Sequence, residues 1–144
     1  MFTLRHPNSG SNSSPEQREQ HAQDTPVKPG TQAVRVTPDE FFRTDIRVGR
    51  VLSAEPFPEA RKPAYKLRID FGPLGEKRSS AQITARYTPE QLAGRLVIAV
   101  TNFPPRRIAS FMSEVLVLGV PAAGTGDVIL LAPDAEVPPG TRVF

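Results

Sequence analysis

Two apolar runs, separated by a short segment rich in proline and arginine, constrain this chain more than any other feature. The first run is Leu96–Val100 and the second is Val115–Leu118. Apolar runs of this length indicate buried strands. Proline fixes φ and donates no backbone hydrogen bond, so the pair Pro104–Pro105 predicts a rigid loop. In that loop we expect Arg106 and Arg107 to stay exposed rather than to join a β-ladder.

The residues of this loop suggest a binding surface. A planar guanidinium suits phosphate oxygens, and an exposed aromatic ring suits the face of a base. Arg106 and Arg107 are therefore candidate phosphate contacts. Asn102 is a candidate hydrogen-bonding group and Phe103 a candidate stacking ring. Structural alternatives stay open for each residue. The arginines could form surface ion pairs, and the Asn102 amide could satisfy backbone groups of its own loop. Phe111 fits a core or a dimer interface better than a stack on a base.

Composition excludes several classes of protein. The 144 residues suffice for one domain and contain no cysteine. Both histidines, His6 and His21, lie in the polar N-terminal part, so no metal or histidine-dependent site is expected in the folded part. The carboxylates Glu55, Glu59 and Asp70 are separated and lack a catalytic partner. We therefore predict a protein that is not an enzyme and has no cofactor.

Charge and hydropathy bear on partners and location. The formal net charge is +3, which permits an anionic partner without requiring one. No apolar stretch approaches the roughly 20 residues that span a bilayer, and the N-terminus lacks the apolar core of a secretory signal. We therefore expect a cytoplasmic protein without membrane insertion.

The chain divides into a polar extension and a folded domain. Residues 1–36 are rich in Ser, Asn, Gln and Pro without helical or strand periodicity, which predicts a disordered extension. Order is expected over residues 37–144. Residues 37–40, Thr-Pro-Asp-Glu, predict a capped helix start, followed by Phe41 and Phe42. A helix this short must dock, either on its own core or on a second subunit. We assign its two phenylalanines to a dimer interface, with Phe111 as a further candidate.

Alternating apolar residues predict an all-β domain. In the clearest strand, Tyr65, Leu67, Ile69 and Phe71 share one face. A change of face near Gly49 suggests a bulge or a sharp bend there. The predicted segments are 45–57, 64–71, 76–83, 96–103 and 114–120, with a short capped helix at 88–94, a further strand at 128–131 and a terminal edge strand at 142–144. This order favours a five-stranded Greek-key barrel of the oligonucleotide/oligosaccharide-binding (OB) type, with a small β-sandwich as the alternative.

A second polar patch falls on the third predicted strand. Ser79 lies beside Ser80, and Ser80, Gln82 and Thr84 share one face by the period of two. Uncharged hydroxyl and amide groups suit base edges or a peptide backbone, although a solvent-facing edge strand would look the same. We place Ser113, which precedes the second apolar run, on the same candidate surface.

The folded region closely resembles the CsaA family of export-related chaperones, whose domain is a tRNA-binding-type OB fold. The matching segments are DIRVGRV at 45–51, FPEARKPAYKLRIDFG at 57–72, SSAQIT at 79–84, YTPEQLAGR at 87–95, VIAVTNFPPRRIASFMSEVLVLG at 97–119 and GDVILLAPDAEVPPGTRV at 126–143. Ser110 stands where the family usually has glycine. If that glycine serves a positive φ or a close approach, Ser110 reshapes the loop.

The resemblance implies a homodimer that binds tRNA or other structured RNA, binds unfolded preproteins and contacts the translocase motor ATPase. We therefore predict a binding groove near the NFPPRR and SSAQIT segments. Salt-sensitive binding would indicate RNA, and salt-insensitive binding would indicate polypeptide. A purely structural adaptor that works through its dimer surface is the alternative.

Overall fold

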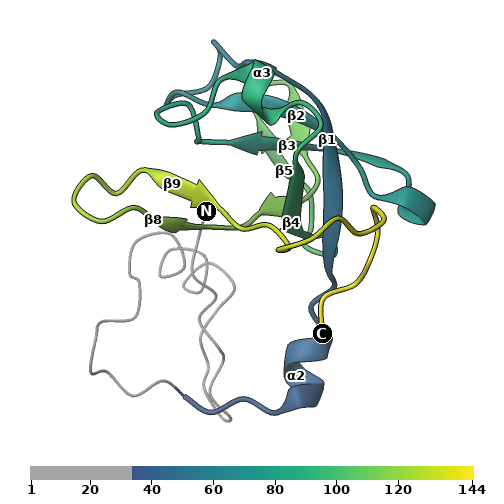
Figure 1. Cartoon of the computed structure of the whole chain (residues 1–144). Helices are drawn as coiled ribbons and strands as arrows, with labels where there is room; N and C mark the ends of the chain where they lie inside the picture. Colours follow the sequence, from purple (N-terminus) through teal and green to yellow (C-terminus); the bar gives the residue numbers. More distant parts are fainter. Residues whose placement is uncertain (1–33) are drawn as a thin grey trace. The chain divides into compact units, whose positions relative to one another are not determined.

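The structure of the protein is a computed structural model that describes residues 34–144 (Figure 1). The predicted extension at 1–36 therefore lies almost wholly outside the described residues. The chain divides into two compact units at Arg43 and Thr44, and each unit is described by itself.

The described part of the N-terminal unit contains helix α2 (Pro38–Phe42). The Thr37 hydroxyl accepts a hydrogen bond from the backbone N–H of Glu40 at 3.2 Å, and the Glu40 carboxylate accepts from the backbone N–H of Thr37 at 3.0 Å. This is the predicted capping box. Phe41 and Phe42 are both exposed, and their rings meet edge to face with centroids 5.2 Å apart.

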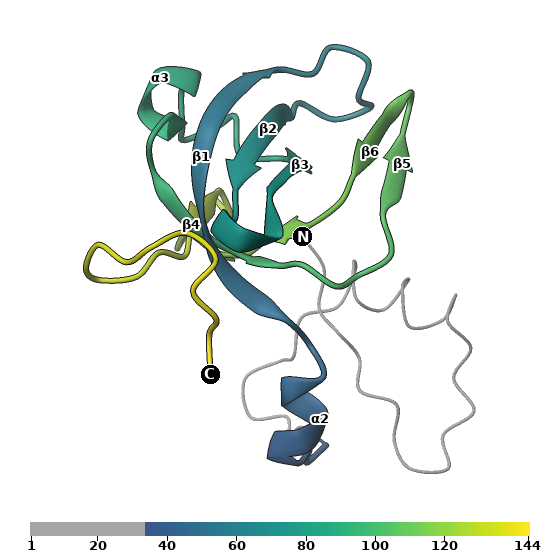
Figure 2. The same cartoon turned by 90° about the vertical axis from the view of Figure 1, so that its right-hand side faces the viewer.

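The second unit is an antiparallel barrel that is nearly closed (Figures 1 and 2). Its strands lie in the order β3-β2-β1-β4-β7, which confirms the predicted OB-type topology. Long β1 pairs with β4 through its first half and with β2 through its second half. The bounds are β1 (Ile46–Pro56), β2 (Tyr65–Asp70), β3 (Glu76–Ala81), β4 (Leu96–Val100) and β7 (Leu116–Val117).

Side chains help to close the barrel between β3 and the segment before β7. The backbone N–H of Glu114 donates to the carbonyl of Arg78 at 2.8 Å, and the Glu114 carboxylate accepts from the N–H of Arg78 at 2.9 Å. Beside them, the Ser79 hydroxyl donates to the carbonyl of Val115 at 3.0 Å. A single acidic side chain thus satisfies a donor that a longer strand would otherwise have to pair.

Short elements complete the second unit. Helix α3 (Pro89–Leu92) lies between β3 and β4 and has the predicted capping box, with Thr88 as N-cap. A 3-10 turn, η1 (Gly72–Leu74), follows β2, and β8 (Gly119–Pro121) pairs with β9 (Val128–Leu130). The expected C-terminal edge strand is only an isolated bridge between Arg47 and Arg142, supported by a 2.8 Å hydrogen bond from Val143 N–H to the Ile46 carbonyl.

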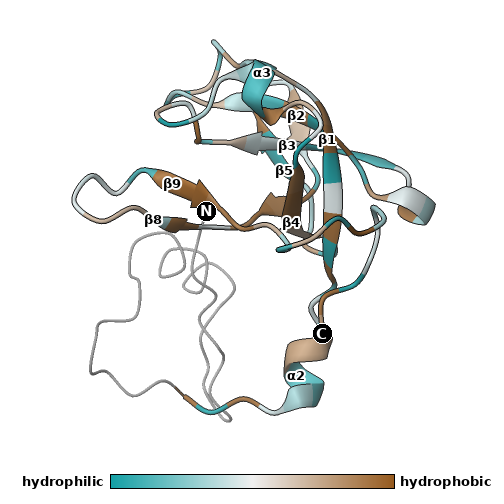
Figure 3. Ribbon diagram, viewed as in Figure 1, coloured by the Kyte–Doolittle hydropathy of each residue, from teal (hydrophilic) through white to brown (hydrophobic). Residues whose placement is uncertain are grey.

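Apolar side chains that alternate along β2 and continue to Phe71 fill the barrel interior. Leu67, Ile69 and Phe71 are fully buried, and they pack with Leu92 of α3 and Val97 of β4. Hydrophobic residues also predominate along β4 and β9 (Figure 3). A separate small cluster of Phe57, Ala64 and Phe111 packs with the partly buried Ala60 and Ile108.

The predicted bulge lies further along β1 than expected. The register shifts between Val51 and Ser53, which leaves Leu52 as the extra residue, whereas Gly49 pairs regularly with Val97. A Cβ atom at Gly49 would lie 2.6 Å from the side chain of Ile69. The glycine therefore marks a close packing contact, not the irregularity in the ladder.

Candidate nucleic-acid interface

The arginine-rich segment forms a hairpin rather than a loop. Strand β5 (Arg106–Ile108) pairs antiparallel with β6 (Phe111–Ser113). The expectation that the prolines keep both arginines out of a ladder was therefore wrong. The pair Pro104–Pro105 precedes the strand, so their missing N–H donors remove no ladder hydrogen bond.

The hairpin register separates the two arginines. Arg106 is opposite Ser113, while Arg107 is opposite Met112. Directly paired residues share a face and neighbouring residues alternate, so Arg106 and Arg107 lie on opposite faces. Both are exposed, and Arg107 Nε donates to the carbonyl of Ala109 at 3.1 Å. They cannot act as one paired guanidinium surface.

Backbone strain at the hairpin tip falls on Ala109 and not on Ser110. Ala109 has a φ of 53°, the one positive value among described residues other than glycine. Ser110, which stands where the resembling family usually has glycine, needs no such conformation. The first of the two conditions for strain at Ser110, a positive φ, is therefore not met.

We predict that Ala109→Gly raises the free energy of unfolding by about 0.5–1 kcal/mol. A left-handed conformation costs an L residue about 1–2 kcal/mol, and glycine avoids this cost. The greater conformational freedom of glycine in the unfolded chain offsets part of the gain in stability. Urea denaturation measures the change. Ser110→Gly is the matched control and should give no stabilisation; an equal gain there would contradict the assignment of strain to Ala109.

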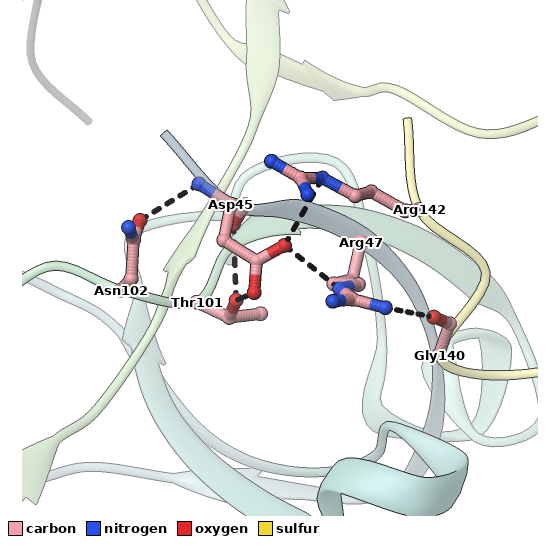
Figure 4. A network of polar contacts seen from close by, with 6 residues as sticks. All are labelled: Asp45, Arg47, Thr101, Asn102, Gly140 and Arg142. Atoms are coloured by element: carbon pink, nitrogen blue, oxygen red, sulfur yellow. Dashed lines mark hydrogen bonds and ion pairs between the residues drawn. The ribbon is translucent and has the colours of Figure 1, made fainter. Parts of the chain in front are cut away.

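Asn102 takes part in a polar network at the start of β1 (Figure 4). Its side-chain oxygen accepts from the backbone N–H of Asp45 at 2.8 Å. The Asp45 carboxylate accepts from Arg47 Nε at 2.8 Å and from the Thr101 hydroxyl at 3.0 Å, and it pairs with Arg142 at 3.5 Å. Arg47 also donates to the carbonyl of Gly140 at 3.0 Å. The Asn102 oxygen thus fixes the chain that leads to the hairpin.

The balance of interactions keeps Asp45 charged. Burial raises the pKa of its carboxyl group, but hydrogen bonds from Arg47 and Thr101 and the charges of Arg47 and Arg142 outweigh burial, so its pKa lies below the usual value. The network therefore joins β1, the end of β4 and the C-terminal segment through an ionised carboxylate.

The residues of the predicted polar patch do not share one strand face in the structure. Ser79 is fully buried, so its assignment to a binding surface was wrong. Strand β3 ends at Ala81, so Gln82 and Thr84 do not continue the face of Ser80 by strand alternation. Ser80 and Ser113 do come together, because the N–H of Ser80 donates to the Ser113 hydroxyl at 3.0 Å.

Two of the aromatic candidates are largely covered. Phe103 is half-buried, and Phe111 is only 9% exposed. The Phe111 ring packs against Phe57 with centroids 5.4 Å apart at an interplanar angle of 62°. Phe111 therefore packs against its own subunit, as the core alternative for this residue predicts.

Sequence reasoning missed two cations that lie over this ring pair. Lys66 Nζ is 4.8 Å from the Phe57 ring centroid, and the Arg78 guanidinium is 5.3 Å from that of Phe111. Alternation along β2 puts Lys66 on the outer face, opposite to Leu67, but no local signal connects it to Phe111 in the distant β5–β6 hairpin.

Nearby Arg68 is differently placed. It donates two hydrogen bonds to the Glu76 carboxylate, at 2.7 and 2.9 Å. These bonds lower the pKa of Glu76 and raise that of Arg68. Arg68 is therefore already matched by an acid in a bidentate pair.

Residues 34–144 hold neither a metal-binding cluster nor a membrane-spanning helix. Within this range, no three His, Cys, Asp or Glu side chains gather as they would to hold a metal ion. None of its helices has the length and apolar character of a membrane span.

The five strands form a small OB-type barrel, and the exposed basic hairpin is its candidate interface. The model of the putative tRNA binding domain family matches residues 46–142, which is nearly the whole second unit. The chain belongs to this putative tRNA binding domain family, and the resemblance to CsaA is confirmed by solved structures.

Chaperone CsaA from Bacillus anthracis is 53% identical with a TM-score of 0.72, and the match covers 77% of this chain and 100% of that chain. CsaA from Picrophilus torridus is 50% identical with a TM-score of 0.71, over 76% and 100% of the two chains. Methionine–tRNA ligase 1 of Sorangium cellulosum is 43% identical over 77% of this chain but only 16% of the ligase. The chain thus spans about a sixth of the length of such a ligase, and the matched family describes a binding module rather than a catalytic domain.

Proposed function

We propose that this protein binds tRNA through the outer face of its barrel beside the β5–β6 hairpin. The observation that carries the proposal is the family match over residues 46–142, which includes every strand of the barrel and the hairpin. The exposed Arg106 and the neighbouring hydroxyls of Ser80 and Ser113 supply groups that suit a phosphate backbone. Gln82 and Thr84, which follow the end of β3 at Ala81, stay candidate contacts in this proposal.

The chemistry of such a surface is mainly electrostatic. Arginine and lysine neutralise phosphates and release counterions, so affinity falls as salt rises. Asn102 acts on this surface chiefly as a positioning residue, because its oxygen holds the backbone of Asp45. Phe103, which follows Asn102, is half-buried and stays a candidate stacking ring.

Arg106→Ala combined with Arg107→Ala should weaken tRNA binding without unfolding the protein. The loss of one or two phosphate contacts should reduce the slope of log K against log salt by about 0.7–1.8 in magnitude. Fluorescence anisotropy with bulk tRNA measures the slope. The double variant Arg86→Ala and Arg95→Ala, in the segments flanking α3, removes the same charge and should leave the slope nearly unchanged. Equal slopes for wild type and the hairpin variant would refute the assignment.

A second proposed function is chaperone-like binding of unfolded polypeptide, including preproteins on their way to export. The observation that favours it is the 53% identity to a protein described as a chaperone, over that protein's whole chain. Contact with the translocase motor ATPase belongs to the same proposal. Apolar and backbone contacts would dominate such binding, so it should depend little on salt.

We further propose a cytoplasmic homodimer in which Phe41 and Phe42 contact a second copy. Each of these residues is 41% exposed on α2, and exposed aromatic residues are typical of association surfaces. Phe41→Ala with Phe42→Ala should convert the dimer to monomer in sedimentation velocity. Retention of the dimer would contradict this interface. Loss of function in this variant alone, with full function in the hairpin variant, would favour the adaptor alternative.

A further inference from the structure

A row of side chains crosses the outer face of the barrel from β2 to the hairpin. Lys66 on β2 is opposite Ser80 on β3, and Arg106 on β5 is opposite Ser113 on β6. The hydrogen bond from Ser80 N–H to the Ser113 hydroxyl connects the two pairs. Figure 2 shows β2, β3, β6 and β5 following one another in this order. The two serines therefore lie between two cations.

The ring pair Phe57–Phe111 holds two cations beside this row. Lys66 Nζ lies over both rings, 4.8 Å from the Phe57 centroid and 5.7 Å from the Phe111 centroid. The Arg78 guanidinium lies 5.3 Å from the Phe111 centroid. Cation–π contacts restrict long, flexible side chains, so less conformational entropy is lost when they meet a ligand.

The same geometry prevents the rings from stacking on bases. Phe57 is 4% exposed and Phe111 is 9% exposed, and the faces that remain are occupied by Lys66 and Arg78. Recognition by base stacking needs an open ring face. The charged groups above the rings are the part of this cluster that meets solvent.

Acidic neighbours distinguish these cations from the others on the sheet. Lys66 is 4.0 Å from Glu59, and Arg78 Nε is 3.7 Å from Glu114. These are loose pairs beside the bidentate Arg68–Glu76 pair. On the β1 side, Glu55 is opposite Lys66, so the positive part of the row lies toward β3 and the hairpin.

We infer that Lys66 and Arg78 are phosphate-contacting residues which, with Arg106, bind the RNA sugar-phosphate backbone while the ring pair Phe57–Phe111 positions them. This inference rests on the proposed tRNA binding and deepens it. It assigns the aromatic residues a positioning role and gives the site little dependence on base sequence. Arg107, on the opposite face of the hairpin, lies outside the row.

The test measures tRNA binding by the Lys66→Met and Arg78→Met variants. Fluorescence anisotropy gives the affinity over a series of KCl concentrations. Methionine keeps an apolar stem over the rings but removes the charge. Each variant should reduce the slope of log K against log salt by about 0.7–1 in magnitude. Arg68→Met is the matched control on the same face and should change the slope little, because its charge is already paired with Glu76. Urea denaturation confirms that each variant is folded.

The outcomes separate this inference from the proposed function. Salt-dependent tRNA binding by the wild type, with unchanged slopes for Lys66→Met and Arg78→Met, would show that these cations only cover the rings and would overturn the inference alone. A slope change in Arg68→Met equal to that of the other two would overturn it as well. No tRNA binding by the wild type at low salt would overturn the proposed function and this inference together.

Discussion

Replacing Gly140 with alanine should destabilise the protein more than either Gly124→Ala or Asp45→Ala. Gly140 has a φ of +91°, and a Cβ atom there would lie 2.4 Å from the backbone carbonyl oxygen of Phe71. A backbone atom cannot turn aside as the end of a flexible side chain can. The cost of the left-handed conformation, about 1–2 kcal/mol, adds to an overpacking cost of about 1–3 kcal/mol.

The position also carries contacts that hold the C-terminal segment. The N–H of Gly140 donates to the Val48 carbonyl at 2.7 Å, and its carbonyl accepts from Arg47. Displacing this backbone would disturb both bonds. Urea denaturation should show a loss of about 2–5 kcal/mol, the sum of the two costs. That loss is a large part of the about 5–15 kcal/mol that stabilises a small domain.

Gly124→Ala separates the two costs. Gly124 has a similar φ of +85°, but a Cβ atom added there would meet nothing within 4 Å beyond its chain neighbours. Its substitution should cost only the conformational part, about 1–2 kcal/mol. Equal losses for the two variants would show that the contact between Gly140 and Phe71 does not limit this position.

Asp45→Ala should have the second largest effect. The Asp45 carboxylate, 23% exposed, accepts hydrogen bonds from Arg47 and Thr101 and pairs with Arg142. Hydrogen bonds to charged groups contribute about 1.5–3 kcal/mol to stability. Because Asp45 is partly exposed, we expect the free energy of unfolding to fall by about 2 kcal/mol. Asp134→Ala, at an exposed position, is the control and should change stability by less than about 0.5 kcal/mol.

The pH dependence of this effect has a definite sign. Because folding lowers the pKa of Asp45, its contribution is complete above the ordinary value of 3.8 and is lost as the pH falls through the lower folded-state pKa. The difference in unfolding free energy between wild type and Asp45→Ala should therefore be constant near neutral pH and shrink below about pH 4. A difference that grows on acidification would contradict the ionised network.

Regular local patterns made much of the fold predictable. The alternation of Leu67, Ile69 and Phe71 correctly identified the inner face of β2, and the threonine caps correctly identified the starts of α2 and α3. These signals depend on neighbours within a few residues, where backbone geometry and the capping hydrogen bonds are decided.

The candidate site was harder to predict because its arrangement depends on distant pairing. The register of the β5–β6 hairpin sends Arg106 and Arg107 to opposite faces, which no local pattern at the double arginine indicates. Burial of Ser79 follows from the closure of the barrel against Val115. The Lys66–Phe57–Phe111 cluster needs three separate segments, so composition and periodicity could not reveal it.

The most direct test of RNA binding compares two ligands with the purified protein. Fluorescence anisotropy is measured with bulk tRNA and with an unfolded, signal-bearing polypeptide, each at low and at high salt. We predict tRNA binding that weakens steeply as salt rises, because phosphate contacts carry it. Negligible tRNA binding at low salt together with salt-insensitive polypeptide binding would contradict the RNA-binding claim and would leave the chaperone-like function as the role of this barrel.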